Sequence, residues 1–509
     1  MSKRFILAHD LGTTGNKATL YDSDGQVCSS AVFGYGTEIP HATWAEQNPL
    51  DWWQAVCVST RQLLAAGHVQ PQDVACISFS GQMMGCVAVD QQARPLRNAI
   101  IWADQRAVAQ AQTIIDGVGV EAVYHITGHR ASPSYSGAKM LWVRQHEPSV
   151  FAGVHKFLQA KDFVIARLTG CFATDYSDAS GTNLYDLQAR DWSAAILSAV
   201  KLDPALLPEL HASTDVVGDV SSQAAENTGL AAGTPVVIGG GDGSCAATGA
   251  GVVREGSAYN YIGSSSWIGM ASAQPVLDPT MRTFTFAHLR PGMFAPTGTM
   301  QAAGASYQWL RDTLCLPEND AAARLNVSPY EKMDLEAEQS PPGAHGLLFL
   351  PYLLGERSPR WNPKARGAYI GLTVKHTRAD IIRATLEGIA FNLRLILEAF
   401  QEQGARIPAM RLIGGGARSR LWRQILADVY KMPVQRPALL EEATSLGAAV
   451  AGGVGVGLFK DFGMAERLAP LLDTTDPNPS AASVYDDLYA LFNRAYEALA
   501  PVYDDLAAF

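Results

Sequence analysis

The chain has 509 residues and a mass of 54.5 kDa, and this length predicts roughly two to four domains. Apolar residues make up 48% and charged residues 17%, as in ordinary globular proteins, and the formal net charge of −10 excludes the basic surface that non-specific nucleic-acid binding needs. Because no apolar run reaches the roughly 18 residues of a membrane span and the N-terminus lacks a secretory cleavage site, we expect a cytoplasmic protein.

The N-terminal segment predicts an antiparallel meander. Residues 5–8 are a short apolar run, and the glycines in residues 11–15 indicate a tight turn. Residues 17–21 and 27–33 predict two more strands, and the sequence Asp-Ser-Asp-Gly between them is a hairpin signal. A helix follows, which Asn48 can cap and Gly67 can end.

The next elements are a buried strand over residues 74–80 and a loop over residues 81–85. The opening pattern then returns: residues 257–262 predict a strand, residues 263–266 a small polar turn, and residues 267–271 another strand. A hairpin around Pro291 and Gly292 and a helix beginning near Ala303 follow.

Near the C-terminus, residues 410–413 predict a strand that ends in three glycines. Ser419 opens a helix over residues 420–430, and residues 443–452 predict a short, tightly packed helix. The two halves therefore share their order of elements, which predicts a bilobal α/β protein with a ligand cleft between the lobes. We expect an N-terminal lobe over residues 1–245 and a C-terminal lobe over residues 246–509.

The cysteines predict neither a zinc site nor a disulfide framework, because they are seven in number, scattered, and never spaced as C-x-x-C. A reducing compartment fits this pattern, and we expect most of the thiols to be buried. The seven are Cys28, Cys57, Cys76, Cys86, Cys171, Cys245 and Cys315.

Two small polar turns are the first candidates for phosphate binding, since the sequence has no G-x-x-x-x-G-K-[ST] motif. The turns at residues 12–15 and 263–265 carry glycines, which let backbone N–H groups approach a phosphate, and hydroxyls, which add donors. One turn in each lobe could clamp a polyphosphate. Each turn taken alone is also typical of an ordinary hairpin.

Two aspartates, Asp10 and Asp242, each end an apolar run beside glycines. Such a carboxylate can orient Mg²⁺ together with substrate phosphates, or accept a proton from an attacking hydroxyl. The structural alternative is that each aspartate binds nearby loop amides. Residues 414–416 form a third glycine-rich loop, which either passes close to a nucleoside or simply turns the chain from strand to helix.

Five segments in order along the chain carry a family resemblance: residues 10–15, 134–146, 263–265, 367–387 and 414–428. Together they resemble the FGGY carbohydrate kinases. The resemblance implies an α/β, actin-like and hexokinase-like (ribonuclease H-like) two-lobe ATPase fold with a central cleft. Within the family the xylulose kinases are the most similar, on residues 41–55, 81–85, 102–106, 174–182, 239–242 and 355–359.

The resemblance also implies roles for single residues, with ATP and Mg²⁺ as cosubstrate and metal. It makes Asp242 the general base and places Asp10 near the metal and the phosphates. It implies sugar contacts at Gln82, Met83, Met84, Asp104 and Asp242. It implies ATP contacts at Thr13, Thr14, Lys17, Gly263, Ser264, Ser265, Gly304, Gly415, Gly416 and Ser419.

Two departures from the xylulose kinase pattern bear on the substrate, and a third, milder one concerns phosphate binding. Met84 stands where these kinases commonly have His, and Gly243 where they commonly have Asn. Histidine and asparagine would hydrogen-bond sugar hydroxyls, so their absence can change the substrate or loosen its selection. Residues 264–266 are three serines instead of the usual Thr-Ser-Gly, which keeps the hydroxyls.

We therefore expect ATP-dependent phosphorylation of a terminal hydroxyl of a ketose, with D-xylulose as the first candidate. The alternatives within the family are D-ribulose, L-xylulose, glycerol, erythritol and gluconate. A third hypothesis is an actin-like ATPase or a sugar sensor without turnover, which the retained Asp242 and the sugar-kinase loops disfavour. The sequence leaves the oligomeric state open, with a homodimer as one option.

Overall fold

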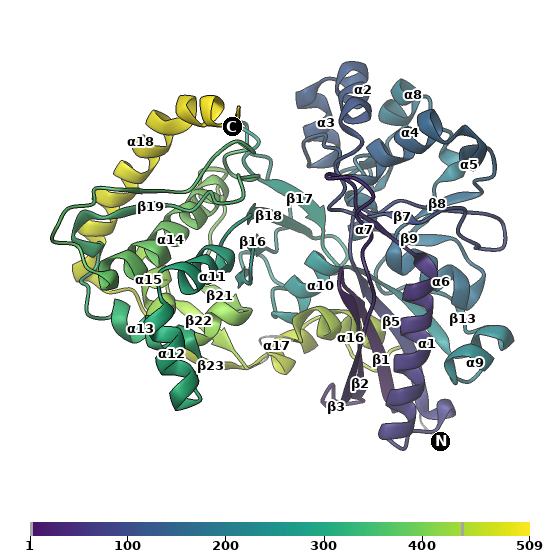
Figure 1. The fold of residues 1–509 in the computed structure, drawn as a ribbon. Helices are drawn as coiled ribbons and strands as arrows, with labels where there is room; N and C mark the ends of the chain where they lie inside the picture. Colours follow the sequence, from purple (N-terminus) through teal and green to yellow (C-terminus); the bar gives the residue numbers. More distant parts are fainter. Residues whose placement is uncertain (1–3, 439–441, 509) are drawn as a thin grey trace.

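The protein is built on two mixed β-sheets, one in each half of the chain. The computed structural model describes residues 4–438 and 442–508, and Figure 1 shows the two sheets in separate lobes. The first sheet has six strands in the order β13-β14-β5-β1-β2-β3, and the second has seven in the order β17-β18-β16-β15-β21-β22-β23.

The strands of the first sheet are β1 (Phe5–Leu11), β2 (Gly15–Asp22), β3 (Val27–Gly34), β5 (Val74–Gly81), β13 (Val216–Asp219) and β14 (Pro235–Gly241). Those of the second are β15 (Ala258–Ile262), β16 (Ser266–Met270), β17 (Phe284–Ala287), β18 (Phe294–Met300), β21 (Met410–Ile413), β22 (Val434–Pro437) and β23 (Leu471–Thr475). In the first sheet, β1 pairs antiparallel with β2 and parallel with β5. In the second sheet, β15 pairs in the same way, antiparallel with β16 and parallel with β21. This matching confirms the predicted repeat and the α/β fold class.

Helix α1 (Pro49–Ala66) has the predicted termini. The Asn48 side chain accepts a hydrogen bond from the Leu50 N–H at 3.1 Å, and Gly67 follows the last turn. Its apolar face includes Trp52, which is buried and packs edge-on against Phe163. The two tryptophans of this helix are therefore core residues.

Smaller helices and strand pairs complete the N-terminal half, and the helices between residues 108 and 152 lie in the upper part of that lobe in Figure 1. The helices are α2 (Val108–Val118), α3 (Val120–Thr127), α4 (Ser136–His146), α5 (Pro148–Ala152), α6 (Ala160–Thr169), α7 (Tyr176–Ser180), α8 (Ala194–Val200), α9 (Ser222–Thr228) and α10 (Asp242–Gly249). The strand pairs are β4 (Glu46–Gln47) with β7 (Ala99–Ile100), β6 (Val87–Val89) with β8 (Lys156–Leu158), β9 (Ala173–Asp175) with β12 (Glu209–His211), and β10 (Tyr185–Asp186) with β11 (Asp191–Trp192).

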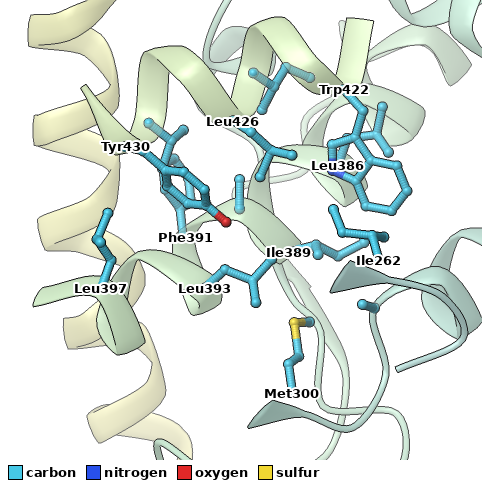
Figure 2. Packing of buried hydrophobic residues seen from close by; sticks show 14 of the residues in the cluster. Ile262, Met300, Leu386, Ile389, Phe391, Leu393, Leu397, Trp422, Leu426 and Tyr430 are labelled. Atoms are coloured by element: carbon cyan, nitrogen blue, oxygen red, sulfur yellow. The ribbon is translucent and has the colours of Figure 1, made fainter. Parts of the chain in front are cut away.

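The C-terminal half adds α11 (Gly304–Thr313), α12 (Leu316–Leu325), α13 (Pro329–Ala337), α14 (Arg378–Glu402), α15 (Arg420–Tyr430), α16 (Ala443–Gly455), α17 (Met464–Leu468), α18 (Ala482–Leu506) and the pair β19 (Leu348–Leu350) with β20 (Ala368–Ile370). Its core lies between α14, α15 and the second sheet. In Figure 2, Leu386 and Phe391 of α14 face Trp422 and Leu426 of α15, with Ile262 from the sheet beside them. Burial of each such side chain stabilises the fold by about 1.5–3 kcal/mol.

Helix α16 belongs to the C-terminal half of the sequence but packs on β1, β5 and β14 of the first sheet (Figure 1). It also crosses α10 at very short range. A Cβ at Gly249 would collide with the Ala443 carbonyl, and a Cβ at Gly447 with the Cys245 carbonyl, so the glycines allow this approach. The expected lobe boundary at residues 245 and 246 falls inside α10, and the division of the chain at that point stays a prediction.

Within the described residues, no helix combines the length and the apolar character that crossing a membrane requires. None of the seven cysteines, all of which lie in the described residues, is in a disulfide bond, and five are buried, as predicted for most; Cys28 and Cys171 are exposed.

Candidate active site

Three parallel strands of the first sheet end at the same edge, and both candidate carboxylates lie there. Strands β5, β1 and β14 run in the same direction, and Asp10 is the penultimate residue of β1. Asp242 directly follows β14 and begins α10. Ligands of open α/β sheets bind outside the carboxyl ends of the strands, so this edge is the expected place for a site.

Asp10 is held by hydroxyls from two distant parts of the chain. Ser80 Oγ at the end of β5 donates to Asp10 Oδ1 at 2.8 Å, and Thr444 Oγ1 at the start of α16 donates to Asp10 Oδ2 at 2.6 Å. Burial raises the pKa of Asp10, although both hydroxyls and the charge of Lys17 oppose the shift. Lys17 itself forms an ion pair with Glu442 at 2.5 Å.

The carboxylate of Asp242 is set up as a proton acceptor. Burial, and next the negative charge of Asp10, raise its pKa to about 7, while a hydrogen bond from the Gly243 N–H opposes the shift. That N–H lies 2.7 Å from Asp242 Oδ1. A general base works best when its pKa lies near the operating pH, so Asp242 suits this role.

A buried polar network fixes the backbone just before Asp242. The Gly241 N–H donates to Ser177 Oγ at 2.9 Å, and Ser177 Oγ donates to Asp175 Oδ2 at 2.5 Å. The other oxygen of Asp175 pairs with Lys161 Nζ at 2.9 Å. All four residues are buried, so this network limits the positions that the Asp242 backbone can take.

Asp242 lines a cavity of about 440 Å³ between the two halves of the molecule, here called the Asp242 cavity. Its lining from the first half includes Met83, Met84 and Trp102. The other half contributes two serines of the 263–265 turn and residues of β17, β18 and the loop that follows β19. These are Ser264, Ser265, Phe284, Phe286, Ala295, Thr297, Thr299, Leu354 and Arg357.

A second cavity of about 440 Å³, the Asp10 cavity, contains Asp10 and the glycine loop. Asp10, Thr444, Gly414 and Gly415 line it. Trp267 lines both cavities and stacks on Tyr261 at 4.0 Å between ring centroids, so the two cavities share a wall.

The two predicted phosphate turns have similar internal bonding. In the first, the Gly12 N–H donates to Gly15 O at 3.0 Å, and Thr13 Oγ1 accepts from Trp102 Nε1 at 2.9 Å. Thr14 uses its carbonyl to accept from the Tyr35 N–H.

In the second turn, the Gly263 N–H donates to Ser265 O at 2.9 Å. Gly304 and Ala305, at the start of α11, donate their N–H groups to Gly263 O and Ser264 O at 2.9 Å each. A Cβ at Gly304 would collide with the Gly263 carbonyl, so this contact requires glycine.

The residues of the third glycine loop have different surroundings, since some line the Asp10 cavity and others pack against the protein. Gly414 has φ of +82°, a conformation that favours glycine. Gly415 faces the Asp10 cavity, whereas a Cβ at Gly416 would press on Ile262. Ser419 caps α15 by accepting from the Trp422 N–H at 3.0 Å.

Two predicted sugar contacts, Gln82 and Asp104, lie in an internal network outside the linings of these two cavities, as the described residues define them. Asp104 Oδ2 accepts from the Ala45 N–H at 2.7 Å and pairs with Arg106 at 2.7 Å. Gln82 Nε2 donates to Gln47 Oε1 at 2.8 Å. Gln82 Nε2 also donates to Gly12 O of the first turn at 3.4 Å, and Asp104 lies two residues after Trp102.

Several residues of the site carry no local sequence signal. Thr444 reaches Asp10 from 434 positions further along the chain, and Trp267 is one aromatic residue in an ordinary strand. Arg357 lies in residues 355–359, a segment that only the family resemblance singled out. Ser80 is the exception, since it ends a predicted strand immediately before a glycine.

The fold and the site define a two-lobed kinase-like ATPase, in which Asp10, Asp242 and residues of the 263–265 and 414–416 turns line two adjoining cavities. Comparison with known proteins gives the family. The FGGY family of carbohydrate kinases matches with its N-terminal domain over residues 5–249 and with its C-terminal domain over residues 258–456. The chain belongs to this family.

Relatives in the family carry different substrate names. The chain is 34% identical over 494 residues to a xylulose kinase of Bacillus subtilis, with 97% of each chain covered. It is 32% identical to a gluconokinase of Bacillus licheniformis, with 99% of this chain and 98% of the relative covered. Ligand-bound xylulose kinase from Lactobacillus acidophilus superposes with a TM-score of 0.91 at 27% identity, covering 99% of each chain.

Proposed function

We propose that this carbohydrate kinase transfers the γ-phosphoryl group of ATP to the terminal hydroxyl of a ketose, with D-xylulose as the first candidate. The observation that carries the proposal is Asp242, a carboxylate with a pKa raised to about 7 on the wall of an interlobe cavity. Xylulose kinases among the relatives support the choice of ketose.

In this reaction the acceptor hydroxyl would lie beside Asp242. As its oxygen bonds to the γ-phosphorus, the bond from that phosphorus to the bridging oxygen of ADP breaks. The proton of the hydroxyl passes to an Asp242 oxygen, and ADP leaves with the bridging oxygen. Donors at Thr13, Thr14, Ser264 and Ser265 would stabilise the transferring group.

ATP would occupy the Asp10 cavity, where Gly415 lies in the lining and Gly416 and Ser419 follow in the same loop. Gly263, Gly304 and Lys17 would act from the supporting turns and strand. Of these residues, Gly415 lines the Asp10 cavity, and the roles of the others are taken from the family resemblance.

Mg²⁺ fits the residues around Asp10. The described part of the chain contains no cluster of three or more His, Cys, Asp or Glu side chains that could hold a metal alone. Mg²⁺ commonly takes one or two carboxylates together with substrate phosphates. Asp10 is a half-buried carboxylate on the cavity wall, so it would hold the ion, which would neutralise phosphate charge.

The test is Asp242→Ala in an ADP-release assay with D-xylulose. Loss of a general base lowers the rate by about 10²- to 10⁴-fold, and the Asp24→Ala change at an exposed hairpin serves as the control. A variant whose rate stays within about threefold of the wild type, well under that range, would remove Asp242 from the mechanism.

An aldonate such as gluconate is the second candidate. Arg357 brings a guanidinium to the Asp242 cavity, and this cation could pair with the carboxylate of an aldonate. Gluconokinases among the relatives support the same option.

A further inference from the structure

We infer that the acceptor of this kinase is a deoxyketose, whose unhydroxylated end lies against Met84. The inference rests on the proposed function, because it names the substrate class of the same site. Four observations carry it: the apolar wall of the Asp242 cavity, the backbone of Met84, the open space at Gly243, and the position of the remaining polar groups.

One wall of the Asp242 cavity is an apolar cluster. Met83, Phe284, Phe286 and Ala295 are buried together, and Met84 packs against them. Met83, Met84 and both phenylalanines also line the cavity. A hydroxyl buried against such side chains loses its hydrogen bonds to water without gaining others, whereas a methyl group loses nothing.

Met84 is held in a backbone conformation that long side chains rarely adopt, with φ of +63°. Lys139 stabilises this backbone conformation, because its Nζ donates a hydrogen bond to Met84 O at 2.8 Å. Lys139 is fully buried, and its Nζ also donates to Ile101 O and Ser134 O. Strained backbone that is stabilised in this way is concentrated at ligand sites, and here it presents a thioether to the cavity.

Gly243 also lines the cavity, immediately after the proposed base. A Cβ at this position would have no described heavy atom within 4 Å, and its φ lies outside the left-handed region. A larger side chain would therefore fit. Glycine leaves the space beside Asp242 open and without a polar side chain.

Most hydroxyls near this wall already donate to the protein. Ser244 Oγ donates to Ala287 O at 2.9 Å, and Tyr259 OH donates to Gly243 O at 3.1 Å. Thr299, Gln301 and Arg357 line the cavity from the C-terminal half. An acceptor whose hydroxyls face these polar groups and whose methyl end faces Met84 therefore matches both the polar and the apolar side of the cavity.

The experiment compares kcat/KM for 1-deoxy-D-xylulose and D-xylulose with MgATP. The pair differs by one hydroxyl at the end distant from the reacting oxygen. An apolar pocket disfavours an added hydroxyl by roughly 10- to 100-fold, so we expect the deoxyketose to be preferred by that factor. A site that hydrogen-bonded this hydroxyl would give the opposite preference.

Matched variants at Met84 and Gly243 test whether the polarity of the side chain, and not its shape, sets the preference for the deoxyketose. Met84→Asn adds an amide and suits the left-handed backbone, and we expect it to lower the preference by about tenfold. Met84→Leu stays apolar and should keep the preference. Gly243→Asn should lower it where Gly243→Ala does not, and both should fold because the space is open.

Three results would overturn the inference. They are a preference for the deoxyketose below about threefold, far short of the expected range, an equal effect of Met84→Leu and Met84→Asn, and phosphorylation of neither compound. The third result would also remove D-xylulose as the first candidate of the proposed function, whereas the first two leave ketose phosphorylation by Asp242 intact.

Discussion

The pKa of Asp242, which burial and next the negative charge of Asp10 raise, sets the pH range of the proposed reaction. Burial and the Asp10 charge together raise the pKa of Asp242 to about 7. Below this pH the carboxylate holds a proton and cannot accept another. Above it the carboxylate is charged and ready to act.

We therefore expect kcat/KM to fall as the pH is lowered through about 7, and the slope of this acidic limb of the pH–rate profile should correspond to one proton. Removing the Asp10 charge with Asp10→Asn should lower the pKa of Asp242 and move this limb to lower pH in the residual activity. A pH–rate profile of both proteins measures the effect. A limb at the same pH in both would contradict this effect of the Asp10 charge.

Ser177, Asp175 and Lys161 show how residues without a reacting atom act on this site. Their hydrogen bonds and ion pair end at the Gly241 N–H, one residue before Asp242. Sequence patterns do not reveal such a network, because its members are separated by many positions and are ordinary polar residues individually.

Among the elements, helix α4 has a positioning role through Lys139. This lysine, near the start of the helix, joins Met84, Ile101 and Ser134 through their backbone carbonyls at 2.6–2.8 Å. The first two carbonyls belong to the loops that carry Met84 and Trp102 to the Asp242 cavity. Burial lowers the pKa of Lys139 to about 7, and the three carbonyls offset the cost of burying its amine.

Lys139→Met should raise the KM for the acceptor and lower its kcat/KM by up to about 10²-fold, the cost of a group misplaced by about 1 Å, and leave the KM for ATP near the wild-type value. The exposed Lys431→Met change is the control. Initial rates with each substrate varied in turn, and a thermal melt of each variant, give the readout. Equal increases in both KM values would indicate a general loss of structure instead.

The secondary structure elements could largely be predicted from the sequence, but the crossing of helices α10 and α16 could not. The strands, the α1 cap and the α15 cap follow from local periodicity and capping residues, and the structure confirms them. The crossing of α10 and α16 depends on glycines in two distant segments. Only the folded chain shows that α16 brings Thr444 to Asp10.

At the scale of the whole molecule, the repeat of strands predicted two lobes and a cleft, and both are present. The cleft cavities draw residues from both halves, with Met84 and Trp102 facing Leu354 and Arg357. The family resemblance implied sugar contacts at Asp242, Met83, Met84 and Asp104; the first three line this cavity, whereas the Asp104 carboxylate accepts from the distant Ala45 N–H, a tertiary contact that no local pattern reveals. Closing the lobes around both substrates would exclude water and limit wasteful ATP hydrolysis.

The most direct measurement is ADP release from MgATP with D-xylulose, D-ribulose, L-xylulose, glycerol and gluconate in parallel, using wild-type protein and Asp242→Asn. We predict that a ketose gives the strongest response, that ADP release without an acceptor is slow, and that Asp242→Asn removes the response. Acceptor-independent ADP release at the same rate, or an equal response in Asp242→Asn, would contradict a ketose kinase that uses Asp242 as its base.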